Sequence, residues 1–88
     1  MFKNKLENKN NICGKEIMRL RNSIKPYVSQ ANLAAKLQLI GLDVDRNAIQ
    51  RIECGKRSIT DIELLAFAKV FGVSVDELFP KSWDEYQK

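Results

Sequence analysis

The sequence predicts an all-α domain built from five helices, and three observations support this fold class. Apolar residues recur three and four positions apart, which places them on one side of a helix. Residues that cap helix starts precede these stretches, and glycine or proline follows them. No stretch shows the alternation of apolar and polar residues that is typical of a half-buried strand. The length of 88 residues favours one domain with a single core.

The first expected helix starts near Ile12. Behind it Ile17, Leu20 and Ile24 recur on one side, which indicates a buried stripe. Pro26 disfavours helical backbone in the residue before it. We therefore expect this helix to end near Ile24.

The second and third expected helices are marked by N-capping residues. Ser29 precedes the apolar-periodic stretch 30–40, and Gly41 is a natural stop. Asp45 precedes a shorter segment, residues 46–53. Because both starts carry an oxygen that can accept from the first free backbone amides, both stretches are expected to be helical.

Two capping boxes predict the last two helices. Thr60–Glu63 opens a helix that ends at Gly72, and Ser74–Glu77 opens a short final helix that Pro80 closes. The side chains expected in the core from the fourth helix are Leu64, Phe67, Ala68 and Phe71.

The chain ends are expected to lie outside this domain. Residues 1–11 are rich in Lys and Asn and predict a basic, mobile N-terminal arm, and residues 80–88 form a C-terminal tail. The arm lacks the apolar stretch of a signal peptide. No segment approaches the roughly 18 apolar residues needed to cross a bilayer. We therefore expect a cytoplasmic protein that makes no membrane contact.

The composition argues against catalysis. The chain has no histidine, which removes the usual general base and the commonest zinc ligand. Its two cysteines, Cys13 and Cys54, do not have the spacing of metal ligands and favour a reducing compartment. We expect no enzyme activity, no metal and no cofactor.

Charge is distributed unevenly along the chain. Residues 1–57 carry 12 basic and 5 acidic residues, whereas residues 58–88 carry 3 and 6. Such an asymmetry favours a polyanionic partner that meets one face of the protein.

The third expected helix, residues 46–53, carries the most information about function. At 100° per residue, Asp45, Ala48, Ile49 and Ile52 fall on the inner side. The outer side presents four side chains whose donors and acceptors match base edges: Arg46, Asn47, Gln50 and Arg51. An outer face without an acid or a lysine is unusual for a solvent-exposed helix.

The start of the second helix favours a phosphate. Free backbone amides and the positive end of the helix dipole lie there, beside Ser29 and Gln30, and Lys36 follows further along. Ser29 is first of all an N-cap, and a phosphate contact would be additional. We therefore expect these three residues to contact the DNA backbone.

Four segments resemble the Cro/repressor-type (XRE) helix-turn-helix family: Gly14–Arg21, Ser29–Ala34, Ile49–Arg57 and Leu64–Phe79. The resemblance implies a five-helix, lambda-repressor-like DNA-binding domain over residues 12–79. It implies a homodimer on a pseudo-palindromic operator, with the second helix across the DNA backbone and the third in the major groove.

The resemblance also implies roles for single residues. Base reading falls to Arg46, Asn47, Gln50 and Arg51, and Gln30 matches the family's glutamine that contacts phosphate and base. Lys56 and Arg57 match the loop that contacts the DNA backbone. Arg21 and Glu53 match a structural ion pair that ties the first helix to the third.

The sequence departs from the family pattern at two places. The link Asn22–Val28 is about two residues longer, and the stretch between Gln30 and Arg46 is about five residues longer, so the second helix should gain roughly a turn. A longer turn could change how deeply the third helix enters the groove.

These observations predict a sequence-specific DNA-binding transcriptional regulator, acting as a repressor that occludes a promoter on prokaryotic nucleoid DNA. The alternative is an antitoxin or adaptor whose main role is to bind a protein partner, for which Phe79–Tyr86 could supply an apolar patch. RNA binding is less favoured, because the sequence offers no aromatic stacking platform.

Overall fold

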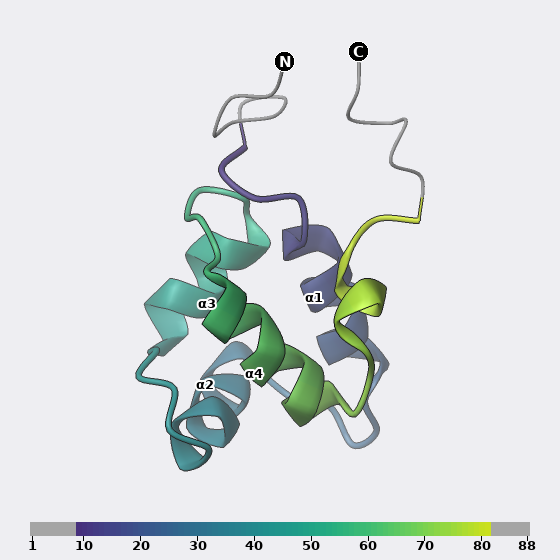
Figure 1. The fold of residues 1–88 in the computed structure, drawn as a ribbon. Coiled ribbons are helices and arrows are strands. Elements are labelled where there is room, and N and C mark those ends of the chain that lie inside the picture. The colour runs from purple at the N-terminus through teal and green to yellow at the C-terminus, as the bar shows by residue number, and fades with distance from the viewer. Residues whose placement is uncertain (1–8, 82–88) are drawn as a thin grey trace.

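The computed structural model describes residues 9–81 and contains four α-helices and one 3-10 turn (Figure 1). The elements are α1 (Gly14–Ser23), α2 (Gln30–Leu39), α3 (Arg46–Glu53), α4 (Asp61–Phe71) and η1 (Val75–Leu78). The all-α class is thus confirmed within the described residues. Most of the expected N-terminal arm (1–8) and of the expected tail (82–88) lies outside them.

The expectation of five α-helices is wrong at its last element. Residues 75–78 form a single 3-10 turn, in which Glu77 N donates to Ser74 O and Phe79 N donates to Asp76 O. Only five residues separate the cap Ser74 from Pro80, whose ring cannot continue a helix. The segment is too short for a second α-helical turn, so the tighter i→i+3 pattern is formed.

Side-chain caps begin three of the helices where the sequence predicted them. Ser29 Oγ accepts from Asn32 N at 3.0 Å, and Asp45 Oδ1 accepts from Ala48 N at 2.8 Å. Thr60 and Glu63 form the expected capping box at the start of α4. These contacts satisfy amides that have no partner inside the helix, which is why the starts could be read from local sequence.

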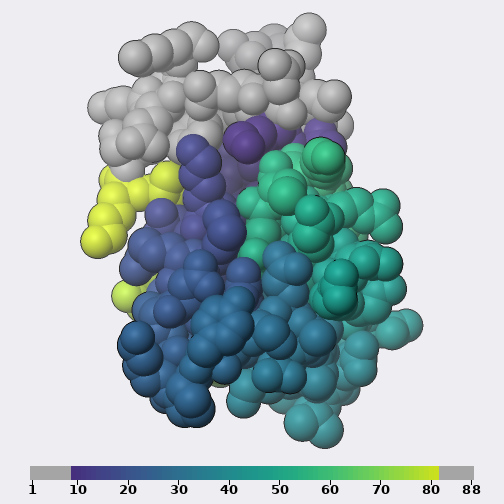
Figure 2. Space-filling model, turned by 180° about the vertical axis from the view of Figure 1, so that it is seen from behind, coloured from purple at the N-terminus to yellow at the C-terminus, as the bar shows by residue number. Residues whose placement is uncertain are grey.

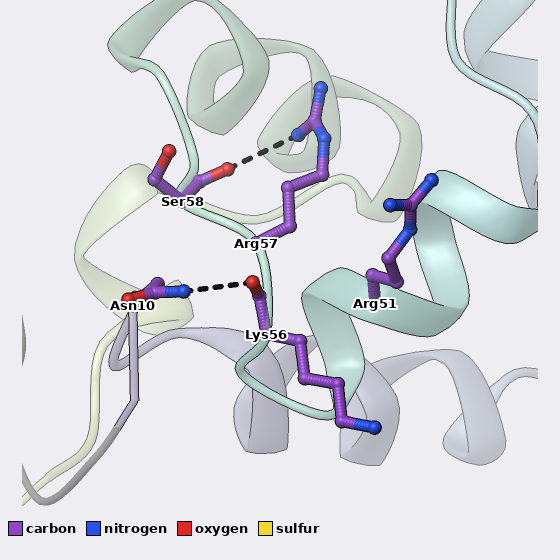
Figure 3. A pocket seen from close by; sticks show the side chains of 5 residues that line it. All are labelled: Asn10, Arg51, Lys56, Arg57 and Ser58. Atoms are coloured by element: carbon purple, nitrogen blue, oxygen red, sulfur yellow. Dashed lines mark hydrogen bonds between the residues drawn. The ribbon is translucent and has the colours of Figure 1, made fainter.

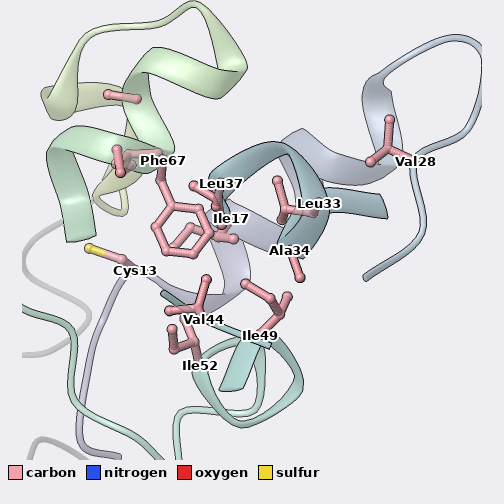
Figure 4. Packing of buried hydrophobic residues seen from close by; sticks show 13 residues of the cluster. Cys13, Ile17, Val28, Leu33, Ala34, Leu37, Val44, Ile49, Ile52 and Phe67 are labelled. Atoms are coloured by element: carbon pink, nitrogen blue, oxygen red, sulfur yellow. The ribbon is translucent and has the colours of Figure 1, made fainter. Parts of the chain in front are cut away.

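The core forms where the inner faces of the four helices meet. Phe67 of α4 lies between Ile17 of α1, Leu37 of α2 and the isoleucines of α3 (Figure 4). The buried apolar residues are Cys13, Ile17, Val28, Leu33, Ala34, Leu37, Val44, Ile49, Ile52, Ala66, Phe67, Ala68 and Leu78. Phe67 and Ala68 are buried as expected, but Leu64 and Phe71 are only partly buried.

Packing of α3 against both α1 and α2 positions the candidate site. Side chains of α2 and α3 adjoin on the face that is turned away from the viewer of Figure 1 (Figure 2). None of the helices in the described part of the chain is long and apolar enough to cross a membrane.

Candidate nucleic-acid interface

The outer face of α3 is open to solvent. Ile49 and Ile52 are fully buried, whereas the four residues expected to read bases are exposed: Arg46, Asn47, Gln50 and Arg51. The helical periodicity therefore assigned the outer face and the two isoleucines correctly, whereas Asp45, also expected on the inner side, is the exposed N-cap. Its last residue, Glu53, is buried among polar partners.

The elongated turn between α2 and α3 does not cover this face. Residues 40–45 fold back on α2, where Gln38 Nε2 donates to Val44 O at 2.7 Å and Leu42 N donates to Leu37 O at 3.0 Å. Val44 is buried in the core. The connection therefore leaves the side chains of α3 unshielded.

A buried ion pair fixes α3 against α1. Arg21 Nε and Nη2 donate to the two carboxylate oxygens of Glu53 at 2.7 and 2.9 Å. The side chains are only 6% and 2% exposed, so both charges depend on each other and on their hydrogen bonds. The hydrogen bond with Glu53 raises the pKa of Arg21 further above its already high ordinary value. This is the pair that the family resemblance implied.

Two further residues complete the surroundings of this pair. Arg21 Nη1 donates to Tyr27 Oη and to Val28 O, both at 3.0 Å, and its guanidinium carbon lies 5.9 Å from the centre of the Tyr27 ring. Gln30 Nε2 donates to Glu53 Oε1 at 2.9 Å. The longer α1–α2 link thus supplies hydrogen-bond partners for Arg21. The side-chain amide nitrogen of Gln30 is hydrogen-bonded within the protein.

The start of α2 lies beside this network. Ser29 uses its hydroxyl as the N-cap, as expected. Lys36 is exposed one turn before the end of the helix. Of the three residues assigned here to the DNA backbone, Lys36 therefore has the most open side chain.

The two basic residues of the loop after α3 have different surroundings. Lys56 is exposed, whereas the Arg57 guanidinium donates to both carboxylate oxygens of Glu63, at 3.0 and 2.8 Å. The hydrogen bonds from Arg57 lower the pKa of Glu63, against the opposing effect of burial. Arg57 therefore holds the loop to the start of α4 in addition to adding positive charge.

A surface hollow of about 760 Å³ lies beside this loop (Figure 3). Its lining residues are Asn10, Arg51, Lys56, Arg57 and Ser58. Three of the five are basic, so the hollow suits an anionic group.

The sequence reasoning missed several residues that shape the site. Asn10 and Asn11 belong to the stretch expected to be a mobile arm, yet both are hydrogen-bonded to the loop after α3. Tyr27 lies in a link that carries no motif, and Glu63 was assigned only a capping role. The Asn–Asn pair directly before the first helix was the one local signal available, because asparagine commonly bonds nearby backbone.

The two cysteines have opposite surroundings. Cys13 is buried in the core, and burial raises the pKa of its thiol to about 11. Cys54 is exposed at the end of α3, where Gln50 Nε2 lies 3.4 Å from its sulfur. Within residues 9–81, no group of three or more His, Cys, Asp or Glu side chains is arranged to hold a metal ion.

Two solved structures with the same fold are a controller protein and a DNA-binding domain by their titles. The restriction-modification controller protein C.AhdI from Aeromonas hydrophila superposes with a TM-score of 0.65 and 25% sequence identity, covering 76% of this chain and 87% of that chain. The DNA-binding domain of BldD superposes with a TM-score of 0.64 and 25% identity, covering 78% and 90%. No curated protein matches the sequence.

The sequence itself matches a family profile described as helix-turn-helix over residues 17–78, which is more than half of the chain. The match begins within α1 and runs to the end of η1, and it includes the outer face of α3 and the loop that follows. The chain therefore belongs to the helix-turn-helix family, of the Cro/repressor (XRE) type.

Proposed function

We propose that this protein is a sequence-specific DNA-binding transcriptional regulator that reads the major groove with α3. The observation that carries the proposal is the open outer face of this helix, with Arg46, Asn47, Gln50 and Arg51 exposed while Ile49 and Ile52 seat it on the core. A major groove admits one α-helix, and Arg pairs with guanine as Asn or Gln pairs with adenine.

Two kinds of contact would contribute to DNA binding, one with phosphates and one with bases. Lys36 in the last turn of α2 and Lys56 after α3 are exposed and would neutralise phosphates, which releases counterions and gives affinity for any duplex. The four outer residues of α3 would then discriminate between bases. Ser29 and Gln30 would bring the start of α2 to the backbone, and Arg57 would add charge beside Lys56.

We further propose that the protein acts as a repressor by promoter occlusion. A domain that fills the major groove of a promoter excludes the polymerase without any ligand or catalytic step. The absence of histidine from the sequence supports a regulator without enzyme activity. Such a regulator would act in the cytoplasm, on the DNA of the nucleoid.

A homodimer on a pseudo-palindromic operator is part of the proposal. Ile62 and Leu65 lie one turn apart on α4 and are 71% and 53% exposed, which favours a protein contact there. In a dimer of this fold, the two copies of α3 would lie one helical turn of DNA apart, about 34–36 Å. Sedimentation with and without bound duplex would show the number of protomers.

The same apolar side chains support the second candidate, an antitoxin or adaptor. Leu39 and Ile40, at the end of α2, are also exposed. This reading predicts a stable complex with a different protein and a duplex affinity that is insensitive to changes on α3. Most of the apolar tail that the sequence offered for this role lies outside the described residues.

Selection of binding sites from a random duplex pool, at two salt concentrations, tests the main proposal. We expect one symmetric motif to be enriched at both concentrations, with weaker binding of all duplexes at the higher one. A pool that shows no enrichment would refute sequence-specific reading. Retention of all sequences alike at low salt would leave only unspecific binding.

A further inference from the structure

The residues directly before α1 are attached to the turn that follows α3. Asn10 N donates to Gly55 O at 2.8 Å, and Asn10 Nδ2 donates to Lys56 O at 2.8 Å (Figure 3). Lys9 Nζ lies 3.5 Å from Cys54 O. Lys9 and Asn10 thus donate to three consecutive carbonyl groups of the turn, those of residues 54–56.

Asn11 lies at the centre of this attachment, and every donor and acceptor position of its side-chain amide is hydrogen-bonded. Its Nδ2 donates to Ile52 O at 3.1 Å and to Arg57 O at 2.7 Å. Its Oδ1 accepts from Cys13 N at 3.0 Å and from Gly14 N at 2.7 Å. A carboxamide offers two donors and two acceptor positions, so the Asn11 side chain can make no further hydrogen bond.

No other side chain makes this set of bonds. Aspartate has the acceptors but lacks the donors, and glutamine would place the amide one methylene farther away. Asn11 therefore has two structural roles. Its oxygen caps the start of α1, and its nitrogen joins the last turn of α3 to Arg57 across the loop that carries Lys56.

Two glycines lie where these segments meet, and at Gly14 the backbones of α1 and α3 approach closely. A Cβ at Gly14 would overlap the carbonyl oxygen of Ile52. Gly55 has a φ of 80°, and a Cβ there would lie 2.9 Å from the Lys9 side chain. A side chain at Gly14 would therefore push α1 away from the end of α3.

This turn bears directly on the proposed interface. Lys56 N donates to Arg51 O at 2.8 Å, so the backbone of Lys56 is fixed to α3 at a residue expected to read bases. Asn10, Arg51 and Lys56 all line the same hollow. Ordering such a loop only on binding would cost free energy that a fixed loop does not lose.

We propose that Lys9–Asn11 is a clasp that pre-orders the turn after α3 for DNA binding, with Asn11 as the positioning residue that acts through Lys56. This inference rests on the proposed function. It assigns part of the expected mobile arm to the DNA-binding apparatus, although Asn11 itself would touch no DNA.

The test uses Asn11→Ser in the full chain. A serine hydroxyl still accepts from the amides at the start of α1, but it cannot donate to both Ile52 O and Arg57 O. The probe is a random-sequence duplex of about 20 base pairs at low salt, where unspecific binding suffices. The readouts are duplex affinity in the natural and the Lys56→Ala background, and hydrogen exchange of the Lys56 amide.

We expect Asn11→Ser to weaken duplex binding about tenfold in the natural background and by less than about twofold in the Lys56→Ala background. Exchange of the Lys56 amide should accelerate at least about tenfold in free Asn11→Ser. Ser23→Ala removes an exposed side-chain hydrogen bond, with Leu20 O, at the opposite end of α1 and is the matched control; it should change neither readout.

Equal weakening in both backgrounds, or an unchanged affinity, would overturn the clasp. Should Asn11→Ser not fold, Asn10→Ala removes the bond with Lys56 O alone and should show the same dependence on Lys56 with a smaller effect. A natural protein that binds no duplex would overturn the proposed function and the clasp together. Tight binding that ignores both asparagines would overturn the clasp only.

Discussion

Arg21 and Glu53 join the first and third helices through two hydrogen bonds of 2.7 and 2.9 Å inside the protein. The same guanidinium reaches Tyr27 and Val28, and the same carboxylate accepts from Gln30. The pair therefore holds α1, α2 and α3 together at the point where α3 ends. The orientation of the proposed DNA-reading helix depends on it.

Removing one partner of this pair should destabilise the protein strongly. We expect Arg21→Ala to lower the free energy of unfolding by about 3 kcal/mol, because it leaves a buried carboxylate without its counter-charge. Urea denaturation measures the loss. Arg19→Ala, which breaks the exposed pair with Glu16 on the same helix, is the control and should have little effect. A similar, small change in both variants would contradict the importance of the buried pair.

We expect Arg51 to contribute to base preference and Lys56 to contribute to phosphate binding. We expect Arg51→Ala to relax base preference at one position of each half-site, with a loss of about 1–3 kcal/mol of discrimination. Competition among duplexes that differ at single positions measures this effect.

Lys56→Ala is the matched variant on the same surface. It should weaken all duplexes alike and reduce the slope of log affinity against log salt by about 0.9, the value for one phosphate contact. The reverse assignment, with Lys56 setting base preference, would mean that α3 lies differently in the groove.

The two thiols should react at very different rates. At pH 8 the Cys13 thiol is almost entirely protonated, because burial raises its pKa to about 11, and the core shields it from reagents. Iodoacetamide should therefore modify Cys54 alone in the folded protein and both cysteines in urea, as read by mass spectrometry. Early modification of Cys13 would contradict the packing of α1.

The modified Cys54 also reports on the interface. An added carboxamidomethyl group at the end of α3 should weaken duplex binding, and Cys54→Ser treated with the same reagent should keep its affinity. Unchanged binding by the modified protein would place this end of α3 away from the DNA.

The Arg57–Glu63 pair should make stability depend on pH in the acid range. The pKa of Glu63 is lowered in the folded protein, so its contribution is present above the unfolded pKa of about 4.3 and is lost as the pH falls through the folded value. Glu63→Gln should thus be less stable than the natural protein at pH 7, and the difference should shrink below about pH 4.

Urea denaturation at pH 7, 5 and 3 measures this difference. In an Arg57→Ala background the pH dependence caused by Glu63→Gln should be reduced, because the hydrogen bonds that lower the pKa of Glu63 most are gone. A difference that stays constant across the three pH values would show that the carboxylate form is not what stabilises the loop.

Local sequence determined the positions of the four α-helices and the outer face of α3. Caps such as Ser29, Asp45 and Thr60 bond to amides within three residues, so their effect is visible without knowledge of the fold. The spacing of Ile49 and Ile52 likewise fixed which side of α3 faces the core. At residues 75–78 a local motif was read correctly, but the space before Pro80 allowed only a 3-10 turn.

Tertiary structure decided how these helices are joined at the site, apart from the Arg21–Glu53 pair, which the family resemblance implies. Asn11 bonds residues up to 46 positions away, and Arg21 meets Glu53 across 32. The Asn–Asn pair before α1 indicates bonds to backbone but not their partners, because the carbonyl groups that Asn11 meets are brought there by the packing of α1 against α3. Hydrogen bonds between distant segments depend on that packing, whereas caps and periodicity depend only on neighbours along the chain.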